Sequence, residues 1–240
     1  MTSLLIARRD LNATLHGLTG YAIIAAILFI DGILFNAYAM GQGARYSHQV
    51  LEQFFYFSSG TTMIASVLIT MRSVAEERQT RTMLLLDSAP ILERQIIVGK
   101  FLAAMAVVSV LTLLTVYMPM LIFVNGKVSI GHIAVGYVGL LALGACTTAL
   151  GVFSSSLFRS QMAAAIFSAV LVVSLLICWL LAGLTDPPFS EILAYMALFD
   201  KHFLPFHEGR LPTQSLFYYA SVTAIALLAA TRNLERRRWQ

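Results

Sequence analysis

The segment QIIVGKFLAAMAVVSVLTLLTVYMPMLIFV, residues 95–124, contains a single charged residue, Lys100. A helix needs about 20 apolar residues to cross the hydrocarbon core of a bilayer. We therefore predict that this segment spans a membrane as a helix. Because it is longer than a bilayer requires, we expect it either to tilt or to extend into water at one end.

Five further segments have the same character, and the composition of the whole chain agrees with them. Of the 240 residues, 58% are hydrophobic and 12% are charged, whereas soluble domains carry roughly 25% charged residues. A core of this size could not bury so much apolar surface, which excludes an ordinary soluble domain. We predict an all-α membrane protein, one transmembrane domain of residues 1–240, with six transmembrane helices: Leu18–Tyr38, Phe54–Met71, Gln95–Val124, His132–Phe158, Gln161–Leu184 and Gln214–Thr231.

The basic residues are distributed unequally between the two sides of these helices. Cytoplasmic segments of membrane proteins hold an excess of Lys and Arg. If the N-terminus is cytoplasmic, the external segments hold four of the 16 Lys and Arg residues, namely Arg45, Lys127, Lys201 and Arg210. We therefore predict that both termini are cytoplasmic. Because the basic residues follow this distribution, we attribute the net charge of +4 to the orientation of the protein in a membrane and not to nucleic-acid binding.

Residues 1–17 have the features of a helix that lies in the membrane interface. Their charged residues follow the apolar ones, which is the reverse of the order in a signal peptide. The apolar residues recur at helical spacing: Leu4, Ala7, Leu11 and Leu15. We expect the basic face of this amphipathic helix to contact lipid headgroups, with Arg8, Arg9 and Lys100 as interface anchors.

The densest run of charge is RSVAEERQTRTMLLLDSAPILER, residues 72–94, between the second and third predicted spans. Its pairs at i, i+4 spacing can support a helix that leaves the membrane: Arg72 with Glu76, and Glu77 with Arg81. A short apolar patch follows at residues 82–86, and Ser88 can cap a next helix that has Pro90 in its first turn. Two interpretations remain open. The run is either a solvated connector or, because of the apolar patch, a surface that binds a partner.

Four segments in order cover most of the chain: GYAIIAAILFIDGILF (20–35), MRSVAEERQTRTMLLLDSAPILERQIIVGKFLA (71–103), YVGLLALGACTTALGVFSSSLFRSQMAAAI (137–166) and YYASVTAIALLAATRNLERRRW (218–239). They resemble the permease subunits of type-2 ATP-binding cassette (ABC) transporters, most closely the gliding-motility-type branch. In the loop, the residues that match the family pattern are Glu76, Glu77, Thr82, Leu85, Leu86, Pro90, Gly99 and Lys100. The family's glycine, glutamate and serine are replaced by Arg81, Leu84 and Ala89.

This resemblance implies that residues 72–94 carry a coupling helix that seats in a cleft of a separate ATPase. Residues 1–17 would be the family's elbow helix, and residues 185–212 its external segment with short helices. The implied ATPase contacts are Arg72, Glu76, Glu77, Arg81, Thr82, Leu85, Leu86 and Pro90, with a second cytoplasmic contact at Phe158, Arg159 and Gln161. The implied partners are a pair of ATPase subunits that hold ATP and Mg, and a second permease, identical or related. The implied location is the bacterial inner membrane.

The chain lacks the sequence signals of an enzyme. It contains neither the G-x-x-x-x-G-K-[ST] phosphate loop nor a G-x-S-x-G nucleophile motif. We therefore expect no catalytic residue and no cofactor in this chain. An ATP-driven process would need its ATPase on another polypeptide.

Two groups of polar residues remain to be explained. Asp31, within the first span, is either a functional intramembrane site or a residue near the outer interface that reaches water or a base such as Lys127. The external segment contains His202 and His207, but Pro205 interrupts any helix that would align them. We therefore predict an ordinary polar loop there and no metal site.

The resemblance leaves two functions open. The permease either couples ATP hydrolysis to substrate translocation or transmits force to an external or periplasmic protein without transporting a substrate. The external segment bears on this choice. In it we predict a short helix, Glu191–Phe199, capped by Ser190 and resting on or dipping into the outer leaflet.

Overall fold

The computed structural model describes residues 2–39, 46–80, 92–125 and 128–238, and all regular structure in these ranges is helical. The elements are α1 (Thr2–His16), α2 (Leu18–Leu34), a π-helical extension η1 (Phe35–Ala39), α3 (Ser47–Thr70), α4 (Ala75–Gln79), α6 (Glu93–Leu114), α7 (Tyr117–Asn125), α8 (Ile130–Leu157), α9 (Gln161–Ala182), α10 (Phe189–Met196), α11 (Leu204–His207) and α12 (Thr213–Arg238). Six segments are long and apolar enough to span a membrane: Leu18–Tyr38, Ser47–Gln79, Glu93–Ile122, Ile130–Leu157, Gln161–Ala182 and Thr213–Arg236. The predicted all-α, six-span architecture is therefore confirmed.

The bundle is organised around α8, which packs against α3, α6, α9 and α12. Two glycines explain how closely α3 approaches α8. A Cβ atom at Gly136 would overlap the ring of Phe55, and one at Gly151 would overlap Thr70. Small residues at such positions let the backbones of two transmembrane helices approach each other closely.

Two spans on the outside of the bundle keep large apolar surfaces. Only 22% of the apolar stretch is buried in the span that contains α2, and the same fraction is buried in α9. On α9, Met162 is 77% exposed and Ile166 is 62% exposed. Such faces need an apolar environment, either lipid or another subunit.

The third span is interrupted, which the sequence analysis did not predict. It consists of α6 and α7, separated by a turn at Thr115 and Val116. Pro119 explains the turn, because proline lacks an N–H for the carbonyl four residues earlier and its ring clashes with that carbonyl. The hydroxyl of Thr115 donates to the Thr112 carbonyl at 2.7 Å. The structure thus adds a break within this long segment, and the expectation that the segment tilts or extends into water stays a prediction.

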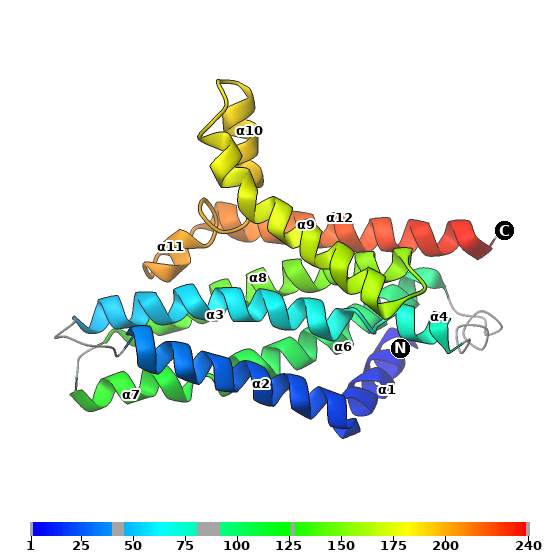
Figure 1. Ribbon diagram of the computed structural model, residues 1–240, viewed down its shortest axis with the longest axis horizontal. Helices are drawn as coiled ribbons and strands as arrows, with labels where there is room; N and C mark the ends of the chain where they lie inside the picture. The colour runs from blue at the N-terminus through cyan, green and yellow to red at the C-terminus, as the bar shows by residue number, and fades with distance from the viewer. Residues whose placement is uncertain (1, 40–45, 81–91, 126–127, 239–240) are drawn as a thin grey trace.

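The two chain ends lie at the same end of the bundle (Figure 1), as six spans require. That end also holds α1 and α4, while α7 lies at the opposite end. The C-terminal part of α9 and the helix α10, which packs against it, project together from the rest of the bundle. It runs from Phe189 to Met196 without a side-chain cap, so both the predicted bounds and the predicted capping by Ser190 are wrong. The backbone N–H of Ser190 already donates to the Asp186 carbonyl, which places this residue inside the first turn.

Candidate functional site

The segment after α3 is held to the end of α8 by one serine side chain. The hydroxyl oxygen of Ser155 accepts hydrogen bonds from the backbone N–H groups of Val74 and Ala75, both at 3.0 Å. The first N–H groups of a helix have no partner within the helix, and a side-chain oxygen satisfies them. Ser155 therefore caps α4 from another helix, and it also donates to the Met71 carbonyl at 3.3 Å.

A second set of contacts joins α4, α8 and α12. The Nη1 of Arg78 donates to the Ser156 carbonyl at 2.5 Å, and the Nδ2 of Asn233 donates to the same carbonyl at 2.7 Å. This carbonyl belongs to the last turn of α8, where the helix leaves its carbonyl groups unpaired and favours cations. The structure thus places residues 72–80 against the end of α8, directly before the predicted second contact at Phe158, Arg159 and Gln161.

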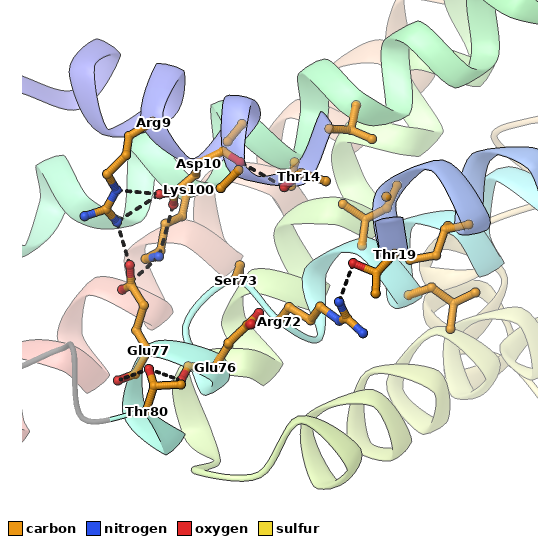
Figure 2. Close-up of a pocket in the computed structure, with 18 residues that line it drawn as sticks. Arg9, Asp10, Thr14, Thr19, Arg72, Ser73, Glu76, Glu77, Thr80 and Lys100 are labelled. Carbon is orange, nitrogen blue, oxygen red and sulfur yellow. Dashed lines mark hydrogen bonds and ion pairs between the residues drawn. The ribbon is translucent and has the colours of Figure 1, made fainter. Parts of the chain in front are cut away.

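Four charged side chains tie α1, α4 and α6 together, and we call them the ionic cluster: Arg9, Asp10, Glu77 and Lys100 (Figure 2). The two oxygens of Glu77 lie 2.6 Å from Arg9 Nη2 and 2.9 Å from Lys100 Nζ. The Oδ2 of Asp10 lies 3.1 Å from Lys100 Nζ, and its Oδ1 lies 2.9 Å from Arg9 Nη2. Two cations and two carboxylates balance, so this end of the bundle carries a neutral, partly buried junction.

The ionic cluster changes the picture of Lys100. We expected this residue to face lipid headgroups as an interface anchor. Its side chain is only 2% exposed and lies between two carboxylates. No local sequence pattern could predict this contact, because Asp10 and Lys100 are 90 positions apart. The acid Asp10, in the third turn of an otherwise basic helix, is a feature that could have suggested a buried partner.

A cavity of about 410 Å³ lies beside the ionic cluster, between α1, α2, α3, α4 and α6. Arg72 lines it and donates from Nη1 to the Thr19 hydroxyl at 2.7 Å. Glu76 lines it as well, but the predicted ion pair between Arg72 and Glu76 is not formed. The turn at residues 71–74 separates the two residues, so they do not share a continuous helix.

The remaining predicted contact residues are placed as follows. Arg81, Thr82, Leu85, Leu86 and Pro90 lie outside the described residues. Arg8 and Arg159 are exposed, and Gln161 begins α9. The ring of Phe158 packs on Phe167, with 5.3 Å between ring centroids.

Asp31 faces the interior of the bundle. It is 3% exposed, and its Oδ1 accepts a hydrogen bond from the Thr61 hydroxyl at 2.7 Å. The side chain therefore packs against α3 and does not reach water as one interpretation expected. Lys127, the base suggested for it, lies outside the described residues.

His202 is held in the external segment by its side-chain contacts, whereas His207 contributes its backbone carbonyl. The Nε2 of His202 donates a hydrogen bond to the Tyr195 carbonyl at 3.0 Å. Its Nδ1 accepts a hydrogen bond from the Ser215 hydroxyl at 3.2 Å. Its ring stacks on Tyr218 with 3.8 Å between centroids, and burial lowers the pKa of His202. The carbonyl of His207 accepts from His132 Nε2 at 2.7 Å. Among the described residues, no three His, Cys, Asp or Glu side chains gather as metal ligands.

The comparison with protein families agrees with this architecture. The family described as ABC-2 family transporter protein matches residues 21–231, which is most of the chain. The chain belongs to this family. It is therefore the membrane permease subunit of an ABC transporter, a kind of subunit that is normally not catalytic itself. Family membership implies association with an ABC ATPase subunit. No curated protein matches the sequence.

Proposed function

We propose that this permease couples ATP hydrolysis on a separate ATPase to movement of its own spans, and that this movement translocates a substrate. The observation that carries the proposal is the attachment of α4. Ser155 and Arg78 fix this helix to α8, and the ionic cluster fixes it to α1 and α6. A force applied to the residues that follow Thr80 would reach three helices at once.

In this proposal the contact surface comprises residues 72–94, with Leu85 and Leu86 as its apolar centre. Phe158, Arg159 and Gln161 form the second contact, next to the first because Arg78 binds Ser156. The ATPase acts as a dimer that holds ATP and Mg. A second permease, identical or related, covers the exposed apolar face of α2 or α9. The complex sits in a bacterial inner membrane with both termini of the permease in the cytoplasm.

A photocrosslinking amino acid at Leu85 or Leu86 tests the contact directly in cells. We expect a crosslink to a protein that contains a Walker-type phosphate loop. The matched control is the same amino acid at Ile192, which is 55% exposed on α10, at the other end of α9 from the proposed contact. Crosslinks from Ile192 to the ATPase, or their absence at both Leu85 and Leu86, would contradict the proposed surface.

A second function is force transmission to an external protein, as in the gliding-motility-type branch. The observation that favours it is α10, which projects from the bundle and exposes Phe189 at 69% and Ile192 at 55%. Under this alternative, the Phe189→Asp, Ile192→Asp variant loses force transmission to the external protein while the ATPase stays bound. Under translocation, the same variant keeps its activity.

A further inference from the structure

The cavity beside the ionic cluster has one apolar wall and one charged wall. Its apolar lining includes Ile23, Leu68 and Val107. Its charged lining consists of the ionic cluster together with Arg72 and Glu76 (Figure 2). Its volume of about 410 Å³ is within the range of small-molecule sites. It lies where α1 meets the ends of two spans, which is the depth of lipid headgroups for an interfacial helix.

The charges around the cavity are not equally satisfied. Arg9 and Lys100 are neutralised by Asp10 and Glu77 within the ionic cluster. Arg72 and Glu76 make no ion pair within the described part of the chain. The Nη1 of Arg72 reaches Thr19, but its Nε is buried without an acceptor. A buried donor without an acceptor is unfavourable, so this guanidinium is positioned to bind an anion.

The buried, unsatisfied Nε of Arg72 and the carboxylate of Glu76 on the same cavity point to the ligand chemistry. A guanidinium binds a phosphate through parallel hydrogen bonds, and the Nε of Arg72 would supply one of them. The carboxylate of Glu76 favours a cation that can donate hydrogen bonds, such as a primary ammonium. The apolar wall suits the glycerol and the first methylene groups of an acyl chain.

We propose that this cavity binds the headgroup of a zwitterionic phospholipid that carries a phosphate and a primary ammonium, the phosphate at Arg72 and the ammonium at Glu76. The bound lipid would fill the space between α1 and α4 and stabilise their junction. The proposal concerns the isolated permease and does not depend on the ATPase.

Lipid binding to the purified permease tests the proposal. The detergent-solubilised, delipidated protein is mixed with phosphatidylethanolamine, phosphatidylglycerol or phosphatidylcholine of equal chain length, and bound lipid is counted by native mass spectrometry. We expect phosphatidylethanolamine to bind about tenfold more tightly than the other two. A charge-assisted hydrogen bond is worth about 1.5–3 kcal/mol, and 1.4 kcal/mol is a factor of ten.

Two variants separate the roles of the two charges. Arg72→Gln should weaken binding of phosphatidylethanolamine about tenfold. Glu76→Gln should weaken phosphatidylethanolamine but not phosphatidylglycerol, so that the preference disappears. Because Glu76 is exposed, this variant should fold normally. Arg232→Gln, at a side chain that is 81% exposed on α12, is the matched control and should bind like the unmodified protein.

Three outcomes would overturn the proposal. They are a preference of the unmodified protein for phosphatidylglycerol, equal binding by the Arg72→Gln variant, and an unchanged preference in the Glu76→Gln variant. Soluble glycerophosphoethanolamine distinguishes a free headgroup compound from a lipid. It should compete only at concentrations at least about a hundredfold higher, because it lacks the methylene groups whose burial adds to the affinity of the lipid. Equal affinity would overturn the assignment to a lipid.

Discussion

Replacing Lys100 with Met should release α1 from the rest of the protein. Lys100 Nζ lies between Asp10 and Glu77 at 3.1 and 2.9 Å, and the side chain is 2% exposed. Removing one partner of a buried ion pair costs about 3–5 kcal/mol, because the other charge remains buried. Here the two carboxylates are 20% and 15% exposed and keep Arg9 as a partner. We therefore expect a smaller cost than for a fully buried pair, about 2–3 kcal/mol.

The assay is hydrogen exchange of the backbone amides of α1 in the purified permease, because this helix can open without unfolding the spans. A cost of about 2–3 kcal/mol increases the opening equilibrium roughly 30- to 150-fold. Adding Glu77→Gln removes the buried carboxylate that Lys100→Met leaves behind. The double variant should therefore lose less protection than the sum of the two single variants.

Arg232→Met is the control for loss of a positive charge. Its partner Glu235 lies 3.9 Å away and both side chains are exposed, so we expect an effect of at most about 0.5 kcal/mol. If Lys100→Met leaves the exchange of α1 within twofold of the unmodified protein, the ionic cluster does not hold α1, and the reasoning from burial is wrong.

Three further predictions concern other parts of the molecule. Ser155→Ala removes the cap on Val74 and Ala75 and should cost about 1 kcal/mol, seen as faster exchange of the α4 amides, with Ser174→Ala as an exposed control; unchanged exchange in α4 would refute the capping role. Thr61→Val removes the hydroxyl that donates to the buried Asp31 and should lower the free energy of unfolding by about 1–3 kcal/mol, whereas Asp31→Asn in the Thr61→Val background should recover part of the loss in a denaturation experiment in detergent; a stable Thr61→Val variant would contradict this. Burial lowers the pKa of His202 in the folded protein, so its contribution to stability is present above the unfolded pKa of about 6.5 and is lost as the pH falls through the lower folded value. Burial also lowers the pKa of His207. We therefore expect His202→Gln to reduce the loss of stability in acid without abolishing it. An identical pH profile of the variant and the unmodified protein in thermal unfolding would refute the prediction.

The sequence predicts the spans well because insertion in a membrane depends on local apolar content. It also predicts α1 as a helix, but its buried face is Ile6 and Ala7, while Leu4 stays 66% exposed. Packing against α6 determines which face of α1 is buried, since Ile6 lies against Gly99 on α6. The break before α7 could have been predicted from Pro119, whose effect on the preceding turn is local.

The contacts of the candidate site could not be predicted in the same way. The spacing of Arg72 and Glu76 favours an ion pair only if both lie on one helix, and the turn at residues 71–74 removes that condition. Ser155, Ser156 and Asn233 act through contacts between residues about 80 positions apart. Such contacts depend on how α8 and α12 pack, which no local pattern encodes.

We propose above that residues 72–94 bind the ATPase that drives this permease. The most direct test is purification of the tagged permease from native membranes in mild detergent, with quantitative mass spectrometry of its partners. We predict that a protein with a Walker-type phosphate loop copurifies in stoichiometric amount. It should be lost from the Leu85→Asp, Leu86→Asp double variant but retained by the Phe189→Asp, Ile192→Asp control. A double variant that inserts in the membrane and still retains the ATPase would contradict the claim.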